Sequence, residues 1–226
     1  MNTINTFSNS DKKKGKFIVF EGLDRLKNEI FTLSGKSTQS KLLVEHLKGK
    51  NVDVKHLYFP NRETVTGQII ANYLKMENNF PNETIHLLFS ANRWERMNEI
   101  KNLLIKGVWV VCDRYAYSGV AYSCGALNLT KSWCMNPDQG LIKPDVVFYL
   151  DVSPTFAQNR SKYGEEIYEK VEVQKRIYEN YKHFSNEDYW INIDATKKID
   201  DIHNDIVQEI AKLKSFEEEY FKFLWS

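Results

Sequence analysis

The sequence has few cysteines and no excess of charge, and both shortages exclude classes of protein. Three cysteines in 226 residues, with no C-x-x-C pair and no histidine nearby, argue against a disulfide framework and a zinc site. Such sparse cysteines are typical of a reducing cytosol. Lysine and arginine total 31, aspartate and glutamate total 30, and the net charge is +1. This balance gives no support for a nucleic-acid partner or a membrane surface.

Long apolar runs are also missing. No stretch approaches the length of about 18 apolar residues that marks a transmembrane helix. The chain starts with polar residues and lacks the apolar core of a secretory signal. We therefore expect a cytoplasmic protein, with the nucleus as the alternative compartment. We expect a free N-terminal tail over residues 1–15 and one domain over residues 16–226.

Short apolar runs alternate with helical patterns along the rest of the chain. We expect strands at 16–21, 53–59, 108–112, 145–150 and 191–193, and helices at 36–48, 82–106 and 199–213. Strands that are apolar throughout and are separated by helices indicate a parallel sheet covered on both faces. The prediction is an α/β sandwich with five parallel strands. A polar, glycine-containing stretch at about 160–169 is predicted to be a lid.

The sequence contains one phosphate-binding motif, and extra residues interrupt it. A P-loop is written G-x-x-x-x-G-K-[ST], and it joins the first strand of a parallel sheet to a helix. Its backbone N–H groups hold phosphates, its lysine reaches the β and γ oxygens, and its hydroxyl binds Mg²⁺. Here Gly22 follows the first strand, and Gly35, Lys36, Ser37 and Thr38 open a helix. Twelve residues separate the two glycines, whereas the motif allows four.

Removing the eight residues 26–33 restores the motif and leaves both flanks in place. Three interpretations of this segment compete. It comes from a retained intron or a misplaced exon boundary, which we favour, or it is an insertion that bulges away, or it destroys the site. Its apolar side chains are unusual for a loop beside a charged ligand.

With that segment set aside, the chain from Lys16 onward closely resembles thymidylate kinase, most closely the Plasmodium type. The matching strings are FEGLDR, SGKSTQ, YFPNRET, HLLFSANRWE, VCDRYAYSGVAYS, GLIKPDVVFYL, YGEEIYEKVEVQ and INIDAT. The resemblance implies a P-loop enzyme that transfers phosphate from ATP to dTMP with Mg²⁺. It also implies a homodimer.

The resemblance further implies roles for single residues. Arg25, Lys36, Asp113 and Arg114 would act in phosphoryl transfer, and Ser37 and Asp113 would hold Mg²⁺. The ATP site would comprise Gly22, Ser34, Gly35, Lys36, Ser37, Thr38 and Arg160. The dTMP site would comprise Asp24, Phe59, Arg62, Phe89, Arg93, Arg114, Ser118, Gly119, Tyr122, Tyr168 and Gln174. Phe89 would stack on thymine, Arg93 would bond the base, and Arg62 would bind the dTMP phosphate.

Physical chemistry supports these assignments without deciding them. Phosphoryl transfer needs two aligned nucleotides and several fixed positive charges. A carboxylate such as Asp113 directly after a parallel strand lies where open α/β sheets bind ligands. From spacing alone, however, Phe89 could be core, Arg93 and Arg62 could be solvated, and Asp113 and Arg114 could form a local ion pair.

The expected function is therefore ATP-dependent phosphorylation of dTMP to dTDP in dTTP synthesis. Two alternatives stay open: a broader deoxynucleoside monophosphate kinase that also uses dGMP, and a catalytically impaired nucleotide-binding dimer. The second applies if the inserted segment is present, because it separates Arg25 from Gly35. The chain as written is then predicted to bind dTMP but to transfer phosphate poorly.

Overall fold

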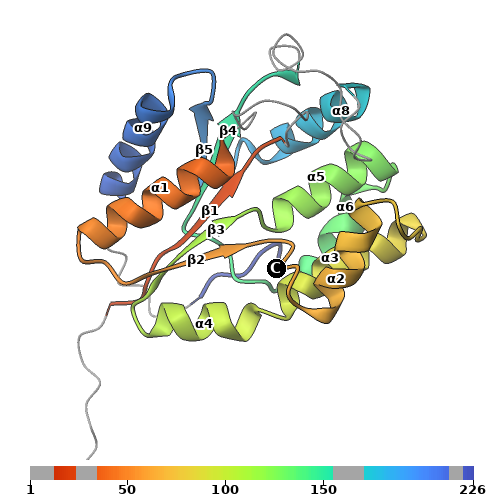
Figure 1. The fold of residues 1–226 in the computed structure, drawn as a ribbon, viewed down its shortest axis with the longest axis horizontal. Coiled ribbons are helices and arrows are strands. Elements are labelled where there is room, and N and C mark those ends of the chain that lie inside the picture. The colour runs from red at the N-terminus through yellow and green to blue at the C-terminus, as the bar shows by residue number, and fades with distance from the viewer. Residues whose placement is uncertain (1–12, 24–34, 155–170, 214–220) are drawn as a thin grey trace, which may run out of the picture.

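The computed structural model describes residues 13–23, 35–154, 171–213 and 221–226. Their framework is one sheet of five parallel strands (Figure 1). Its order is β2-β3-β1-β4-β5. The strands are β1 (Phe17–Glu21), β2 (Val54–Tyr58), β3 (Trp109–Asp113), β4 (Val146–Asp151) and β5 (Trp190–Asp194). Each of the five predicted strands is found within about a residue of its expected bounds.

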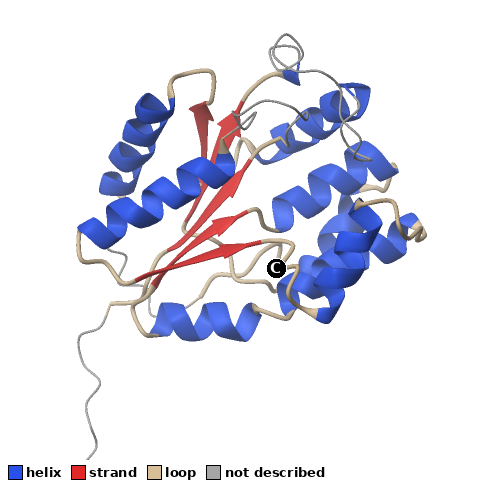
Figure 2. Ribbon diagram, viewed as in Figure 1, coloured by secondary structure: helices blue, strands red, loops and turns tan. Residues whose placement is uncertain are grey.

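Helices cover both faces of this sheet (Figure 2). On one face, α1 (Lys36–Gly49) and α9 (Ile199–Lys212) pack on a mostly aliphatic core that includes Ile18 and Val111. On the other face, α4 (Met97–Ile105), α5 (Ala116–Leu127) and α8 (Val171–Tyr181) pack on a larger, aromatic-rich core. The predicted α/β sandwich is confirmed. All five residues of β1 are buried because β1 is central and has a helical layer on each side.

A smaller group of elements lies at the carboxyl ends of β2 and β3. It consists of α2 (Val65–Leu74), α3 (Asn82–Trp94), α6 (Lys131–Met135) and the 3₁₀ turn η1 (Asn136–Asp138). A second 3₁₀ turn, η2 (Lys182–Phe184), follows α8. Helices α2 and α3 share a small core around Ile70 and Ile85. This group forms one wall of the pocket described below.

The prediction of a single helix over residues 82–106 is wrong. The segment forms α3 and α4, and the break falls at Glu95 and Arg96. The apolar stripe of α3, including Ile85, packs with α2, whereas that of α4, including Ile100, packs against the sheet. One straight helix does not reach both partners, so the chain turns between them.

The ends of the described chain are held against the domain. In the tail predicted for residues 1–15, residues 1–12 lie outside the described part, whereas the N–H of Gly15 donates to the Leu104 carbonyl at 2.8 Å. The predicted lid also lies outside the described residues. Near the C-terminus, Phe223 forms an antiparallel bridge with Ile142, and Leu224 is buried. Among the described helices, none is long and apolar enough to cross a membrane.

Candidate active site

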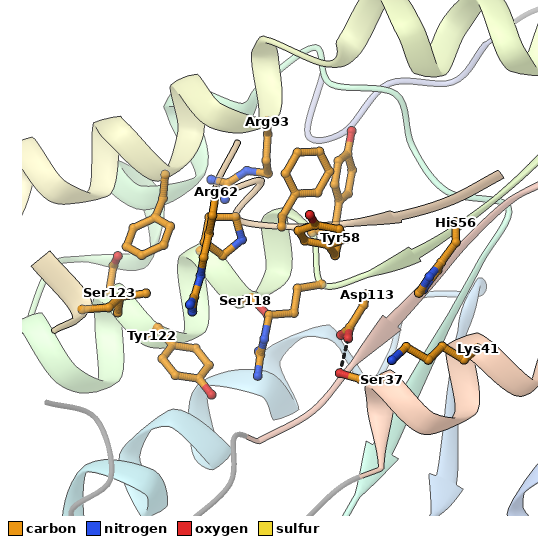
Figure 3. A pocket seen from close by; sticks show the side chains of 17 residues that line it. Ser37, Lys41, His56, Tyr58, Arg62, Arg93, Asp113, Ser118, Tyr122 and Ser123 are labelled. Atoms are coloured by element: carbon orange, nitrogen blue, oxygen red, sulfur yellow. Dashed lines mark hydrogen bonds between the residues drawn. The ribbon is translucent and has the colours of Figure 1, made fainter. Parts of the chain in front are cut away.

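A pocket of about 520 Å³ opens at the carboxyl ends of β2 and β3, beside the start of α1 (Figure 3). Ser37, Lys41, His56 and Asp113 lie at one end of it, and Arg62, Arg93, Tyr122 and Ser123 at the other. Its lining also includes Tyr58, Phe59, Pro60, Leu74, Phe89, Arg114, Tyr115, Ser118 and Gly119. The pocket therefore combines several cations, one carboxylate and a set of aromatic rings at the edge where open parallel sheets bind ligands.

The start of α1 brings the P-loop lysine and serine to this edge. Gly35 caps the helix with φ 68°, a left-handed conformation that costs glycine little. The preceding described segment contains Gly22 at φ 147°. The Lys36 ammonium donates to the Leu23 carbonyl at 2.5 Å, so the two described ends of the interrupted motif lie together. A helix N-terminus with a lysine beside it favours bound phosphate.

Ser37 and Asp113 fit a magnesium ion. The Ser37 hydroxyl donates to Asp113 Oδ2 at 2.5 Å, and Asp113 is 9 % exposed. In the described part of the chain, Asp113 Oδ1 is buried without a hydrogen-bond partner. No group of three or more histidine, cysteine or acidic residues gathers within the described ranges. Mg²⁺ suits this arrangement because it usually takes one or two protein oxygens and completes its shell with water and phosphate.

Arg114 follows Asp113 in a left-handed conformation, with φ 69°. Its backbone N–H donates to the Phe20 carbonyl at 2.9 Å, which fixes the turn against β1. Nη1 of its guanidinium donates to the Ser118 hydroxyl at 2.9 Å, and the guanidinium lies 5.3 Å from the centre of the Tyr122 ring. The Arg114 side chain is thus aimed across the pocket wall formed by α5.

Arg93 is buried and paired. Its guanidinium donates to both carboxylate oxygens of Asp138, with Nη2 to Oδ2 at 2.6 Å and Nε to Oδ1 at 3.1 Å. Ser90 also donates to Asp138, and the Trp94 indole N–H donates to the Pro137 carbonyl at 2.7 Å. A two-point ion pair of this kind sets the orientation of the guanidinium. The interpretation of Arg93 as a solvated arginine is therefore wrong.

Gly119 allows Arg93 to occupy this position. A Cβ on Gly119 would lie 2.7 Å from Nη2 of Arg93 and 3.1 Å from Cζ. The α5 backbone consequently supports the guanidinium directly. The predicted pocket residue Gly119 has a physical reason to lack a side chain.

The loop that carries Arg62 is fixed by the buried side chain of Asn92. Asn92 Oδ1 accepts from the Asn61 backbone N–H at 2.7 Å, and Nδ2 donates to the Asn61 carbonyl at 3.1 Å. Thr64 caps α2 by accepting from the Gly67 N–H at 3.1 Å. Arg62 itself is exposed at the mouth of the pocket.

His86 orients the hydroxyl of Ser123. Nε2 of His86 lies 3.0 Å from the Cys134 carbonyl, which only accepts, so Nε2 carries the hydrogen. Nδ1 therefore accepts from the Ser123 hydroxyl at 2.7 Å. Burial, with Arg93 nearby, lowers the pKa of His86 and keeps the ring neutral. Ser123 then presents lone pairs to the pocket.

The structure brings together ten of the residues predicted for the site, and these are Ser37, Phe59, Arg62, Phe89, Arg93, Asp113, Arg114, Ser118, Gly119 and Tyr122. Gly22, Gly35, Lys36 and Thr38 lie in β1–α1, next to the pocket, without lining it. Gln174 is buried in α8 and does not line it either. Five predictions lie outside the described residues, namely Asp24, Arg25, Ser34, Arg160 and Tyr168.

Sequence reasoning missed several residues of the site. Ser123 lies four residues after Gly119 on α5, so helical spacing could have placed it on the same face. Lys41 had the same signal, four residues after Ser37. His56 lines the pocket, and burial lowers its pKa. No local pattern marks Asp138, because its partner is 45 residues away in sequence.

Comparison with known proteins decides the family. The family described as "Thymidylate kinase" matches residues 20–206. The chain belongs to the thymidylate kinase family. A thymidylate kinase from Plasmodium falciparum is 78% identical over 216 residues, covering 96% of this chain and 99% of that protein. The thymidylate kinase of Schizosaccharomyces pombe is 41% identical, and the match covers 92% of this chain and 97% of that protein. The thymidylate kinase of Homo sapiens is 39% identical, and the match covers 86% of this chain and 89% of that protein.

The fold supports the same family. A solved structure of thymidylate kinase from Candida albicans matches with a TM-score of 0.81 at 30% identity, covering 94% of this chain and 99% of that one. The family fold is the P-loop sandwich that the sequence predicted. The family's match begins at Phe20, so it spans the interrupted motif, the Asp113–Arg114 turn and α5.

Proposed function

We propose that the protein transfers the γ-phosphate of ATP to dTMP and produces dTDP. The observation that carries this proposal is the pocket itself, which joins Ser37 and Asp113 at one end to Arg62 and Arg93 at the other (Figure 3). The 78% identity to a thymidylate kinase over nearly the whole chain names the reaction. The test is an ADP-coupled assay with ATP and dTMP on this chain and on the chain lacking residues 26–33, and absence of turnover in both proteins would contradict the proposal.

The acceptor nucleotide occupies the end of the pocket between α3 and α5. Phe89 stacks on the base, and the guanidinium of Arg93, fixed by Asp138, donates to it. Gly119, Ser118 and Tyr122 line the nucleoside wall. Arg62 binds the acceptor phosphate from the loop that Asn92 fixes. Because these groups are positioned before the nucleotide arrives, little ordering is needed on binding.

The donor phosphates lie at the start of α1. Lys36 and the backbone around Gly35 bind them, and Arg114 reaches between donor and acceptor. Ser37 and Asp113 would hold Mg²⁺, which supplies neutralising charge on the phosphate oxygens. Fixed cations at the transferring group lower the barrier because charge accumulates on its oxygens. Asp24, Arg25, Arg160 and Tyr168 would complete the site, with residues 160–169 as its lid.

We further propose that residues 26–33 are absent from the natural protein. Removing them joins Arg25 to Ser34 and restores G-x-x-x-x-G-K-S between β1 and α1. Sequencing of the mature transcript tests this directly, and finding the eight codons there would reject it. The two other interpretations, an insertion that bulges away and one that destroys the site, are separated by the next experiment.

We predict that deletion of residues 26–33 raises turnover. With the segment in place, Arg25 lies eleven positions before Lys36, whereas it lies three positions before it once the eight residues 26–33 are removed. One misplaced cation at the transferring phosphate costs about 10²-fold or more in turnover. The measurement is kcat for ATP and dTMP in both proteins, together with dTMP binding. Equal, fast turnover in both would mean that the segment bulges away harmlessly.

A broader kinase that also uses dGMP is the less favoured alternative, since the relatives named above are thymidylate kinases. Competition between dTMP and dGMP in the same assay separates the two. Assembly as a homodimer is a further proposal. Among the described residues, Val65 on α2 and Leu87 and Trp94 on α3 are large, apolar and exposed. Light scattering of the purified protein tests the dimer.

A further inference from the structure

Glu21, the last residue of β1, is fully buried and lies outside every role assigned above. Its carboxylate receives four hydrogen bonds. Oε1 accepts from the backbone N–H groups of Tyr115 at 2.9 Å and Ser118 at 3.2 Å. Oε2 accepts from the Ser118 hydroxyl at 2.5 Å and the Tyr181 hydroxyl at 3.0 Å. One side chain thus joins the end of β1, the start of α5 and the end of α8.

The two carboxylate oxygens of Glu21 have different partners. Oε1 satisfies N–H groups at the N-terminus of α5, a position where a carboxylate is favourable. Oε2 accepts the hydrogen of the Ser118 hydroxyl, so the lone pairs of Ser118 face Arg114 and the Tyr181 hydroxyl, whose oxygen lies 2.9 Å from Ser118 Oγ. Nη1 of Arg114 donates to that hydroxyl at 2.9 Å. The hydrogen bonds therefore run in one direction, from Arg114 to Ser118 to Glu21.

Opposing effects act on the charge of Glu21. Burial raises the pKa of the Glu21 carboxyl, while the nearby Arg114 guanidinium and the Ser118 and Tyr115 donors act against that rise. A carboxylate that accepts four donors is satisfied as an anion. A protonated Glu21 would have to donate at Oε2, where two hydroxyls already donate.

We propose that Glu21 is a positioning residue for phosphoryl transfer, which sets the Ser118 hydroxyl as an acceptor and thereby aims the Arg114 guanidinium into the pocket. The inference rests on the proposed function, since it concerns the same reaction. Glu21 is fully buried and does not line the pocket. It acts through Ser118 and Arg114, and it ties both to the strand that leads into the P-loop.

The test is Glu21→Gln, made in the full chain and in the chain lacking residues 26–33. The amide oxygen replaces Oε1 and keeps the bonds to the α5 backbone, but the NH₂ group donates to Ser118 and competes with Arg114. We expect kcat to fall by about 100-fold, as for a catalytic group displaced by about 1 Å. We expect the KM for ATP to stay within about threefold, because a displaced transition-state contact lowers kcat more than ground-state binding.

A double-mutant cycle with Arg114→Ala separates positioning from general weakening. If Glu21 acts through Arg114, Glu21→Gln adds less than about threefold to the loss in Arg114→Ala. Full additivity of the two losses would overturn the proposal. Ser118→Ala removes the link and is expected to reproduce most of the loss in kcat.

Asp145→Asn provides the matched control. Asp145 is a carboxylate at the opposite end of β1, where Oδ2 accepts from the Phe17 N–H at 2.7 Å. We expect this variant to lose stability in urea with unchanged kcat. An equal loss of kcat in Asp145→Asn would overturn the proposal for Glu21 and leave the proposed function standing. Full activity in Glu21→Gln would do the same. Absence of turnover on dTMP both in this chain and in the chain lacking residues 26–33 would overturn the proposed function, and this inference with it.

Discussion

At the scale of single residues, the absence of a side chain at Gly119 is as important to the pocket as any charge. We predict that Gly119→Ala raises the KM for dTMP by about 10-fold or more, because the new methyl group displaces Arg93, whose hydrogen bonds are charge-assisted. A Cβ there would lie 2.7 Å from Nη2 of Arg93. Steady-state kinetics with dTMP as the varied substrate measures the effect.

Gly49→Ala is the control for that substitution. Gly49 ends α1, and a Cβ there meets nothing within 4 Å. Alanine should leave the kinetics unchanged and slightly stabilise the helix. A Gly119→Ala protein with the parent KM would mean that the Arg93–Asp138 pair does not face the bound base.

Some residues of the pocket could be predicted from the sequence, and others could not. Ten residues predicted from motif strings line the pocket, and most of them follow a strand end or lie on one helical face, whereas Arg62 lies in the loop between β2 and α2. The roles of Asp138 and Glu21 were not predicted, since they depend on partners 45 and 97 residues away in sequence, respectively. Such long-range pairing has no periodic signal in the sequence.

At the scale of elements, the loop between β2 and α2 depends on one buried amide. We predict that Asn92→Ala lowers the free energy of unfolding by about 1–3 kcal/mol, because it leaves the Asn61 N–H buried and unpaired and leaves the Asn61 carbonyl with the Thr64 hydroxyl as its donor. The KM for dTMP should rise as the loop with Arg62 loosens. Urea unfolding and steady-state kinetics measure the two effects.

Asn180→Ala is the comparison for Asn92→Ala. Asn180 Nδ2 donates to the Arg176 carbonyl on the surface of α8. Surface substitutions of this kind change stability by about 0.5 kcal/mol or less. If both variants unfold at the same urea concentration, the loop is held by other contacts.

Element boundaries were predictable where burial is simple. The five strands are short apolar runs, and each was found within about a residue. The break between α3 and α4 was not, because both halves have helical periodicity. The turn at Glu95 and Arg96 follows from the different partners of Ile85 and Ile100.

At the scale of the whole molecule, three buried or half-buried histidines couple stability to pH. Burial lowers the pKa of His56, His86 and His203. The unfolded chain protonates them below about pH 6.5, whereas the folded chain keeps them neutral to lower pH. The contribution of these neutral histidines to the free energy of unfolding is therefore fully present above about pH 6.5 and is lost as the pH falls below that value.

Urea unfolding of the parent and of His86→Gln at pH 7.5 and pH 5.5 measures this coupling. We predict a smaller loss of stability on acidification in His86→Gln than in the parent. Burial raises the pKa of Glu21, which acts in the opposite sense, so the difference between the two proteins is the informative quantity. The exposed residue His183 provides a control, and His183→Gln should behave as the parent does.

The bond between Trp94 and Pro137 has an optical consequence. Two of the five tryptophans lie close to the segment that ends in Asp138. The Trp94 indole donates to the carbonyl of Pro137, the residue before Asp138. The centre of the Trp133 ring lies 5.3 Å from that of His86. A base bound to Arg93 changes the electrostatic surroundings of the Arg93–Asp138 pair and with them those of both indoles. Intrinsic emission therefore reports occupation of the acceptor end without any attached dye, and Trp94→Phe should remove part of that signal.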